Sequence, residues 1–443
     1  MQSTYQSWGN FPKVSQRIRS IPWRKKPLLL PETPDTVLAH GLGRSYGDVC
    51  LNNNGILLTT RKLNRFIQFD VDEGVLRCEA GVSLAEILAL CVPQGWFLPV
   101  TPGTQFVTIG GAIANDVHGK NHHCAGTFGR HVLQFELLRS DGERLLCTPT
   151  SNEPYYAATI GGLGLTGLIT WAEIKLKRIS HRAMQVESIQ FSQLDEFFEL
   201  SQQSDQDYDY TVAWLDCNNS QALGRGIFFR GNHVAADEIP KDWKLPRFNR
   251  LPPLLRTMPI NLPGFVLNRW TISAFNTFYY KKTRQSQLID YQPFFYPLDA
   301  ILEWKRLYGK NGFLQYQFVI PDHRMLKEIL QKIVASGLGS FLAVLKTFGE
   351  LASPGLLSFP RPGVTLALDF PIKGAVTFEL LAQLDEKVRE MGGAVYPCKD
   401  ARLSARHFQA FYPQWTKFAE YIDPRFSSSF WRRVTETPLC VKS

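Results

Sequence analysis

Residues 102–129 constrain the fold of this chain more than any other stretch. They read PGTQFVTIGGAIANDVHGKNHHCAGTFG and contain six glycines. Glycine is favoured where the backbone takes a positive φ or where another group must approach it closely. Backbone N–H groups exposed in such a loop form a cradle for phosphate oxygens. His118, Lys120, His122 and His123 bring proton-carrying and cationic groups to the same segment, so a surface loop with scattered histidines is the less favoured interpretation.

A second glycine-rich turn occurs earlier in the chain. The sequence GLGRSYGD, residues 41–48, directly follows a predicted strand at 37–39. It contains the GxG of a Rossmann dinucleotide site, but Tyr46 and Gly47 break the expected spacing and no amphipathic helix follows. We therefore disfavour a Rossmann NAD site and expect a pyrophosphate cradle of another design, with Arg44 and Ser45 as donors.

Length and composition describe a globular protein. The chain has 443 residues, of which 44% are hydrophobic and 20% are charged. Its first residues lack the apolar core of a secretory signal, and no run of about 18 apolar residues is present. The eight cysteines form no CxxC pair and are expected to be buried thiols of a reducing compartment. We therefore expect a cytoplasmic protein and favour the cytoplasmic over the periplasmic face of a membrane.

Residues 241–284 combine positive charge with aromatic rings. The stretch has nine Lys or Arg residues and a single acid, Asp242, within a chain of net charge +9. Basic residues beside amphipathic rings suit an anionic lipid surface. A cap loop that packs its aromatics on the protein is the alternative. Nucleic acid is not expected as a partner, because no nucleic-acid motif accompanies the basic residues.

Glycine density divides the chain. Glycine-rich turns between short strands fill residues 1–179, where Ser83 begins a helix with a capping box and Asp141-Gly142 predicts a hairpin turn. Strands and helices alternate in residues 180–393, which predicts a second, α+β domain.

Two parts of this division carry more specific expectations. Residues 231–300 are rich in proline and aromatic residues and are expected to be irregular. Residues 394–443 place Phe408, Phe411, Trp415, Phe418 and Ile422 on one helical stripe, which predicts a tail that packs back on the first domain.

Three segments together resemble the FAD-binding domain of the vanillyl-alcohol-oxidase/p-cresol-methylhydroxylase family. They are GLGRSYGD at 41–48, PGTxxVTIGGAIAxDVHGKNHH at 102–123 and GGLGLTGLI at 161–169. The resemblance is closer still to the flavin subunits of decaprenylphosphoryl-β-D-ribose 2′-epimerases, which are 2′-oxidases. It is extended by FYPLDAILEW at 295–304, GFLQYQFVIP at 312–321, LDFPIK at 368–373 and KDARL at 399–403.

The resemblance implies an α+β fold in which a two-subdomain FAD-binding domain carries a substrate (cap) domain with a central antiparallel sheet. It assigns 1–179 to the FAD-binding domain, 180–393 to the cap with the insertion 241–284, and 394–443 to a returning C-terminal segment. It also implies non-covalent FAD. Relatives that tether FAD often carry a histidine in the first glycine loop, where this chain has Arg44, Ser45 and Tyr46.

Carried over by resemblance, the cofactor-binding residues lie in three loops. The first loop holds the pyrophosphate, the second runs beneath the flavin and the diphosphate, and the third borders the adenosine half. The predicted residues are Gly41, Leu42, Gly43, Arg44, Ser45, Tyr46, Gly47, Pro102, Gly103, Thr104, Thr108, Gly110, Gly111, Ala112, Ala114, Asn115, His118, Gly119, Asn121, Gly162, Gly164, Gly167 and Ile169.

Alcohol oxidation by a flavin needs a base for the hydroxyl proton and positive charge near the reduced flavin. His118 and Lys120 flank Gly119 and can face the reacting hydroxyl, and Lys399 resembles the family's lysine between flavin and substrate. We predict these three residues as catalytic. The alternatives are a His118 bonded to the main chain and a Lys120 that clamps a phosphate.

Five residues are predicted to bind substrate. Gln315 and Gln317 alternate on a strand, share a face and can hydrogen-bond a sugar ring. By the same resemblance, Trp214 is expected to form a wall of the sugar pocket and Tyr308 to lie nearby. Both side chains are also typical of a hydrophobic core. Thr365 stands two residues before Ala367, which occupies the position of the family's active-site cysteine. This departure alters the pocket shape and removes the target of thiol-directed inhibitors.

A metal site is not expected. His122, His123, Cys124 and His131 lie close in sequence, but their spacing matches no zinc ligand set and no acidic residues accompany them.

The resemblance, together with these residues, implies an FAD-dependent oxidoreductase that oxidises the 2′-hydroxyl of a polyprenylphosphoryl-β-D-ribose to the 2′-ketone. A separate NAD(P)H-dependent keto-reductase would complete the inversion to the arabinose form, a precursor of cell-wall arabinan. The alternative is an FAD-dependent oxidase of a soluble sugar, aldonolactone or polyol, which needs no basic insertion. A non-enzymatic flavin-bearing adaptor is disfavoured because His118, Lys120 and Lys399 occur together.

Overall fold

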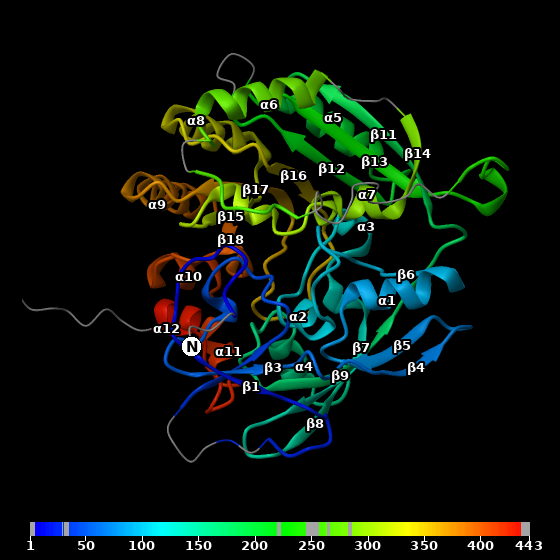
Figure 1. The fold of residues 1–443 in the computed structure, drawn as a ribbon, viewed down its shortest axis with the longest axis vertical. Helices are drawn as coiled ribbons and strands as arrows, with labels where there is room; N and C mark the ends of the chain where they lie inside the picture. The colour runs from blue at the N-terminus through cyan, green and yellow to red at the C-terminus, as the bar shows by residue number, and fades with distance from the viewer. Residues whose placement is uncertain are drawn as a thin grey trace, which may run out of the picture.

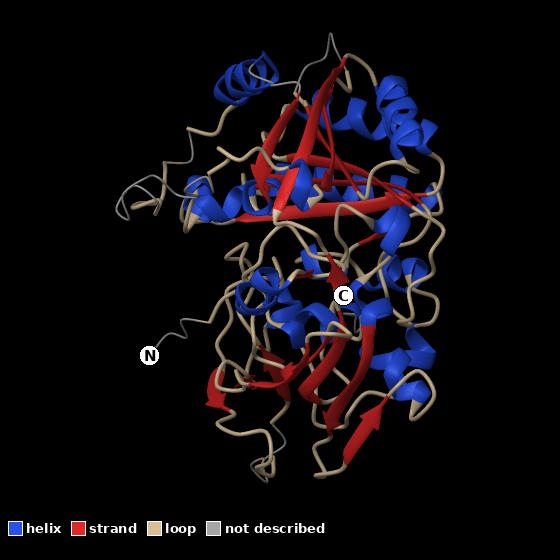
Figure 2. Cartoon of the chain, turned by 90° about the vertical axis from the view of Figure 1, so that its right-hand side faces the viewer, coloured by secondary structure: helices blue, strands red, loops and turns tan. Residues whose placement is uncertain are grey.

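The computed structural model describes residues 5–28, 30, 35–218, 223–244, 257–263, 266–281 and 286–435. Its strands gather in two regions, one in the upper and one in the lower half of the molecule (Figures 1 and 2). The lower half holds the glycine-rich turns, and the upper half holds one large antiparallel sheet. The α+β fold with an antiparallel second sheet is as predicted.

The lower half contains a five-stranded antiparallel sheet, a three-stranded parallel sheet and short helices. In sheet order the strands are β4 (Phe66–Asp70), β5 (Val75–Glu79), β9 (Leu168–Lys175), β7 (Val132–Leu138) and β8 (Arg144–Cys147), and then β1 (Arg17–Ser20), β3 (Ile56–Thr59) and β2 (Val37–His40). The helices are α1 (Leu84–Cys91), α2 (Ile109–Ala114), α3 (His122–Ala125) and α4 (Glu153–Thr159). The capping box at Ser83 and the hairpin turn at Asp141-Gly142, between β7 and β8, are confirmed.

The upper half is built on an eight-stranded antiparallel sheet. In sheet order its strands are β14 (Ser286–Asp290), β11 (Ala183–Phe191), β13 (Gly226–His233), β12 (Tyr210–Leu215), β16 (Ala343–Phe348), β17 (Gly363–Pro371), β15 (Phe313–Ile320) and β18 (Ala394–Val395). Helices α5 (Leu194–Ser204), α8 (Leu326–Ser336) and α9 (Ala375–Glu390) bury Phe197, Ile329 and Leu384 in the same core as the strands. The other face of this sheet, which these helices do not cover, is turned toward the lower half.

Shorter elements connect these layers. A two-stranded antiparallel pair joins β6 (Trp96–Phe97) to β10 (Lys177–Arg178). The 3₁₀ helices are η1 (Asp48–Cys50), η2 (Val92–Gln94), η3 (Phe128–His131), η4 (Ala236–Glu238), η6 (Pro297–Ala300), η7 (Trp304–Tyr308), η8 (His323–Met325) and η9 (Pro397–Lys399).

The prediction of an irregular 231–300 is wrong for much of its described part. Helix α6 (Arg269–Lys281), strand β14 and helix α7 (Tyr291–Phe295) all lie within it. No proline occurs between Pro263 and Pro293, so nothing there interrupts a helix. The Asn268 side chain accepts hydrogen bonds from the N–H groups of Trp270 and Thr271 and caps the start of α6. Residues 245–256, 264–265 and 282–285 of the basic insertion lie outside the described residues.

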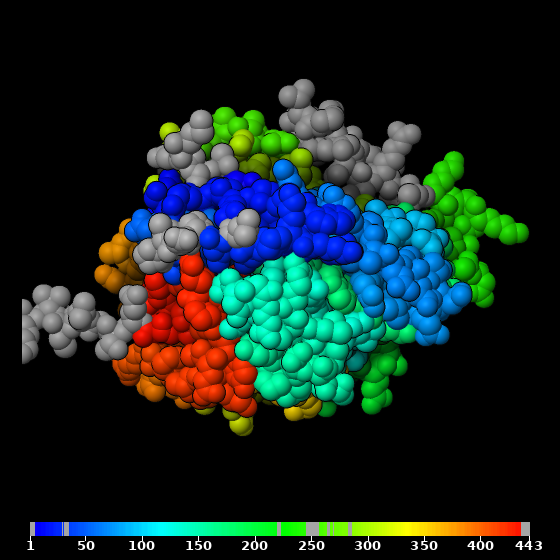
Figure 3. All heavy atoms as spheres, turned by 90° about the horizontal axis from the view of Figure 1, so that it is seen from below, coloured from blue at the N-terminus to red at the C-terminus, as the bar shows by residue number. Residues whose placement is uncertain are grey.

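The C-terminal stripe is two helices instead of one. Helix α10 (Ala405–Phe411) ends before Pro413, and α11 (Trp415–Ala419) begins after it. A last helix, α12 (Ser429–Thr435), follows. The tail lies against the N-terminal part of the chain, as the adjacent red and blue surfaces of Figure 3 show, and Phe426 forms a parallel bridge with Val37.

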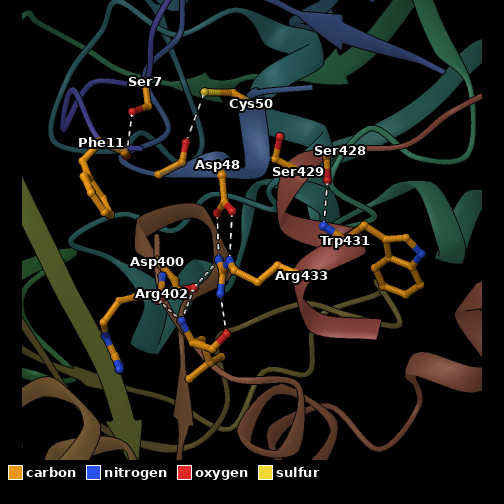
Figure 4. A network of polar contacts seen from close by, with 12 residues as sticks. Ser7, Phe11, Asp48, Cys50, Asp400, Arg402, Ser428, Ser429, Trp431 and Arg433 are labelled. Atoms are coloured by element: carbon orange, nitrogen blue, oxygen red, sulfur yellow. Dashed lines mark hydrogen bonds and ion pairs between the residues drawn. The ribbon is translucent and has the colours of Figure 1, made fainter. Parts of the chain in front are cut away.

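One polar network ties this tail to the first glycine loop (Figure 4). The guanidinium of Arg433 on α12 donates to both carboxylate oxygens of Asp48, at 2.9 and 2.7 Å, and to Asp400 Oδ2 at 2.9 Å. Both carboxylates are buried. Because removing one partner of a buried ion pair leaves an uncompensated charge, the network fixes residues 397–403 against residues 41–48.

The described residues include no helix long and apolar enough to cross a bilayer. The seven described cysteines are free, and five of them are buried. The prediction of burial is wrong for Cys124, which is exposed at the end of the short helix α3, and only partly met by Cys50. Cys440 lies outside the described residues.

Candidate active site

A cavity of about 630 Å³ is lined by residues of both halves. We call it the central cavity. The lower half contributes residues 41–46 and parts of 101–120, and the upper half contributes strands β12, β15 and β16. A third contribution comes from Tyr396, Cys398 and Lys399 around η9. A cavity of this size suits a small-molecule or cofactor site.

Strand alternation decides which upper-half side chains reach the central cavity. On β15, Leu314, Tyr316 and Phe318 belong to the hydrophobic core under the helices, so Gln315 and Gln317 point the other way, into the cavity wall. Strand β16 follows the same rule, with Leu345 in the core and Lys346 in the cavity wall. These two strands, which lie on either side of β17, therefore present polar side chains on a face whose reverse is apolar.

The first glycine loop leaves backbone donors without partners. Among the residues that the structure describes, the N–H groups of residues 41–45 donate no hydrogen bond. Gly43 has φ +63°, a conformation that side chains disfavour. Arg44 stacks on Trp8 with 4.0 Å from its guanidinium carbon to the ring centroid, and its buried Nε has no hydrogen-bond partner. Because buried polar groups are rarely left unpaired, this wall fits an anionic ligand such as a diphosphate.

Close packing explains two of the glycines. A Cβ on Gly41 would lie 2.4 Å from Thr108 Oγ1, so the first loop rests directly on the start of α2. At Gly103, by contrast, a Cβ would meet nothing within 4 Å. The loop around Gly103 therefore leaves open space in the cavity wall, as a bound cofactor requires.

Most of the predicted site residues line the central cavity, and six do not. Those outside its wall are Gly47, Ala112, Asn121, Gly162, Tyr308 and Thr365. Ala112 is buried on the inner side of α2, Asn121 donates to Pro99 O, and the backbone at Gly162 lies against Ala158 O. These residues shape the loops behind the wall.

Tyr308 and Thr365 support the wall from behind. Tyr308 is buried and stacks on Phe313 with a centroid distance of 4.3 Å. Thr365 is fully buried and donates to Phe318 O at 2.7 Å. The structure thus places neither side chain at the cavity surface, where direct substrate contact was predicted.

His118 lies between two partners from different strands. Its Nε2 is 2.9 Å from Gln317 Nε2, and its Nδ1 is 3.0 Å from Lys346 Nζ. Thr365 Oγ1 gives its proton to Phe318 O and so accepts from the Gln317 amide at 3.2 Å, which fixes the amide NH₂ toward both Thr365 and His118. His118 Nε2 is therefore an acceptor, and the ring carries its proton on Nδ1.

This arrangement places a neutral amine at Lys346. Since Nδ1–H donates, Lys346 Nζ accepts the hydrogen bond. Burial lowers the pKa of Lys346 to about 7, with the charges of Lys120 and Lys399 contributing. Burial also lowers the pKa of His118 well below its usual value, with Lys346 adding to the shift. The two side chains together form a base that can take up one proton near neutral pH.

Lys346 was not predicted from the sequence. The only available signal is a lysine within the apolar strand AVLKTF. Its proximity to His118 depends on the register of β16 with β12 and β17, which the sequence alone does not specify.

Lys120 and Lys399 also line the central cavity. Lys120 Nζ donates to Phe295 O at 3.2 Å, and burial lowers its pKa to about 8. Lys399 Nζ lies 3.9 Å from the ring centroid of Tyr46, in the first glycine loop. Burial lowers the pKa of Lys399, while Cys398 and Asp369 oppose the shift.

Asp369 is a second residue that sequence reasoning missed. It is 1% exposed on β17, where Oδ1 accepts from Gln315 Nε2 at 2.6 Å and Oδ2 accepts from Tyr308 at 3.2 Å. Burial raises the pKa of Asp369 to about 7, against the effects of Gln315, Lys399 and Tyr308. The carboxyl therefore orients Gln315 and, when ionised, balances the charge of Lys399 without reaching the cavity surface.

We expect Asp369→Asn to remove a pH dependence of stability. Between the ordinary carboxyl pKa near 4 and about 7, native Asp369 keeps a proton that the unfolded chain has released, so its contribution to the free energy of unfolding falls as pH rises. Between pH 5 and pH 8, the free energy of unfolding of the wild type should therefore fall by at least about 1 kcal/mol more than that of Asp369→Asn, as measured by urea unfolding. Asp322→Asn is the control, since the pKa of that exposed carboxyl is lowered to about 2 and does not titrate in this range. Parallel pH profiles for wild type and Asp369→Asn would contradict the assignment.

The histidines near α3 have structural partners. His122 Nδ1 accepts from Gly349 N–H at 3.2 Å, and His123 Nε2 is 2.9 Å from Tyr208 O. Within the described ranges, no three His, Cys, Asp or Glu side chains converge as a metal site.

Comparison with known proteins identifies the family to which this chain belongs. Residues 30–148 match the FAD binding domain family. Over 410 residues, the chain is 38% identical to decaprenylphosphoryl-beta-D-ribose oxidase of Mycolicibacterium smegmatis (strain ATCC 700084 / mc(2)155), covering 90% of this chain and 89% of that protein. The chain belongs to the decaprenylphosphoryl-β-D-ribose oxidase family. As a member of that oxidase family, it is an FAD-dependent oxidoreductase.

Other relatives extend the comparison in two ways. An uncharacterized protein in the mprA 5′ region of Streptomyces coelicolor is 30% identical over 370 residues, which cover 80% of this chain and all of that protein. Human Delta(24)-sterol reductase is 30% identical over 110 residues, or 25% of this chain. The oxidase family thus matches along most of this chain, whereas the sterol reductase matches only a quarter of it.

Proposed function

We propose that this enzyme oxidises the 2′-hydroxyl of a polyprenylphosphoryl-β-D-ribose to the 2′-ketone, the first half of epimerisation to the arabinose form. The observation that carries the proposal is the composition of the central cavity. A glycine-rich wall with free backbone donors faces a wall that holds Gln315, Gln317 and a proton-accepting pair, His118 and Lys346. Identity of 38% to a relative named for oxidation of such a ribose supports it.

The residues of the cavity fit FAD held without a covalent bond. The unpaired N–H groups of residues 41–45 and the side chain of Arg44 would bind the diphosphate. The space at Gly103 and the small residues of α2 would admit the ring system. When bound, FAD supplies an acceptor for the hydride that leaves the alcohol carbon.

The side chains of this chain handle the proton and the charge. Gln315, oriented by Asp369, would hydrogen-bond a hydroxyl of the sugar. For His118 Nε2 to receive the proton of the reacting hydroxyl, that hydroxyl would have to replace the Gln317 amide as its hydrogen-bond donor. The Nδ1 proton would then pass to Lys346 Nζ, 3.0 Å away. Lys399, whose Nζ lies 3.9 Å from the ring centroid of Tyr46, would supply positive charge that stabilises the cofactor once it is reduced.

The product also suggests its partners. A 2′-ketone must be reduced on the opposite face to complete an inversion, so we propose a separate NAD(P)H-dependent keto-reductase as the next enzyme. Since the polyprenyl chain of the substrate belongs in a bilayer, we further propose that the protein works at an anionic membrane surface.

Anaerobic titration with a short-chain prenylphosphoryl ribose tests the proposal. We expect the visible flavin absorbance of the holoenzyme to disappear with formation of one equivalent of ketone. Loss of that absorbance with a free aldose, aldonolactone or polyol, and none with the prenylphosphoryl ribose, would replace this substrate with a soluble one.

A further inference from the structure

Helix α6 is amphipathic, but its aromatic side is exposed, whereas an ordinary surface helix buries its apolar side. Its exposed residues are Trp270, Thr271, Ala274, Phe275, Phe278, Tyr279 and Lys281. They recur at helical spacing and so share one side of the helix. Trp270 is 82% exposed and Phe278 is 64% exposed. An ordinary surface helix turns such side chains inward.

The inward side of α6 is held mainly by polar contacts. Asn276 is fully buried and donates to Asp216 Oδ1 at 2.8 Å. The other carboxylate oxygen of Asp216 accepts from Arg225 at 2.8 Å, and the Arg225 guanidinium stacks on Tyr280. Because a buried amide needs its partner, these contacts fix the rotation of the helix. These contacts therefore hold the aromatic side of α6 facing outward.

An unbroken row of rings connects this outward side with the central cavity. Trp214 and Tyr279 lie 5.0 Å apart between centroids, Tyr279 and Phe275 lie 6.0 Å apart, and Phe275 and Phe341 lie 5.8 Å apart. All four line the central cavity. Trp270 and Phe278 continue the apolar surface beyond the cavity, on the helix at the top of Figure 1.

Charge supports a lipid occupant. The sequence of α6, RWTISAFNTFYYK, contains no acidic residue, and residues 241–284 as a whole carry nine Lys or Arg residues against Asp242. Each basic residue close to an anionic bilayer favours binding, and interfacial tryptophan and phenylalanine insert beside the headgroups.

We propose that the outward side of α6 inserts into the interfacial layer of an anionic bilayer. The row of Trp214, Tyr279, Phe275 and Phe341, with Trp270 and Phe278 beyond it, then gives a polyprenyl chain a path from the lipid to the cavity. The proposal rests on the proposed function for the identity of the chain that follows this path, but the insertion itself does not depend on turnover. It assigns lipid binding to one helix and one side of it.

The test is binding of the holoenzyme to vesicles of equal parts phosphatidylglycerol and phosphatidylcholine, measured by co-sedimentation. We expect Trp270→Ser/Phe278→Ser to bind at least about tenfold more weakly than wild type, because most of the inserted apolar area is lost. Binding of the wild type should fall with added salt and on vesicles of phosphatidylcholine alone. Phe66→Ser is the matched control, since Phe66 is 41% exposed on β4 in the lower half.

Further measurements on the double variant separate the possible failures. Far-UV circular dichroism and FAD content should be unchanged in the double variant, and so should turnover of a short-chain substrate in solution. Equal vesicle binding by wild type and double variant, or no binding by wild type, would overturn the insertion. A change of oligomeric state in the double variant without a change in lipid binding would also overturn it, in favour of a protein contact. Vesicle binding that depends on Trp270, together with no oxidation of the prenylphosphoryl ribose, would instead reject the proposed substrate alone.

Discussion

Replacing Lys399 with alanine is expected to leave FAD bound and to slow its reduction by substrate at least about a hundredfold, the usual loss when one charge-stabilising group is removed from an active site. Lys399 Nζ sits 3.9 Å from the centroid of Tyr46, in the loop that fits the diphosphate. Its removal also leaves buried Asp369 without the cation that opposes its protonation. Stopped-flow absorbance under anaerobic conditions measures the reduction rate directly.

Two variants make this result specific. Lys399→Met keeps an aliphatic stem over the Tyr46 ring and removes only the charge, so it should be nearly as slow as the alanine variant. Lys387→Ala removes an exposed lysine that pairs with Glu390 on α9 and should reduce at the wild-type rate. Wild-type reduction kinetics in Lys399→Met would remove the charge of Lys399 from the mechanism and leave it a packing role.

Local patterns predicted the parts of the site that lie close together in sequence. The glycines of residues 41–46 and 102–119 indicated a phosphate cradle because close approach and positive φ are backbone properties of single residues. The alternation of Gln315 and Gln317 indicated a shared face because strand periodicity is local. The resemblance to flavin oxidases rested on these same segments, and the family match confirms FAD.

Side chains that meet only through long-range pairing were beyond sequence reasoning. Lys346 and His118 are 228 positions apart, and their contact requires the antiparallel register of β16 in the upper sheet. Asp369 lies within the LDF motif, but its role appears only when β15 pairs with β17 and sets Gln315 opposite it. Tyr308 is a residue type that often lines pockets, yet its ring stacks on Phe313 and lies behind the cavity wall.

Helix α6 shows why composition alone misled the prediction for residues 231–300. Prolines and aromatic residues led to the prediction of an irregular chain, although no proline lies between Pro263 and Pro293. Hydrophobic periodicity indicates which side of a helix is apolar, but not whether that side faces the core. The contact between Asn276 and Asp216 decides this, and it joins residues 60 positions apart.

Gly47→Ala should destabilise the protein by about 3 kcal/mol or more and abolish FAD binding at ordinary concentrations. A Cβ at this position would lie 1.8 Å from the carbonyl oxygen of Asp400 and 2.6 Å from its carbonyl carbon. These are backbone atoms, and the ion pairs of Asp400 and Asp48 with Arg433 hold both segments in place. The clash therefore pushes the first glycine loop away from the segment that carries Lys399.

Gly103→Ala is the matched control for this prediction. Its Cβ would meet no atom within 4 Å, so urea unfolding of the FAD-free protein should change by no more than about 0.5 kcal/mol. The same Cβ would occupy space in the cavity wall, and titration with FAD should show weaker binding. The two substitutions thus separate backbone packing from cofactor contact. If FAD-free Gly47→Ala were as stable as wild type, residues 398–401 could move without loss, and the packing of Gly47 on Asp400 would not be what positions Lys399.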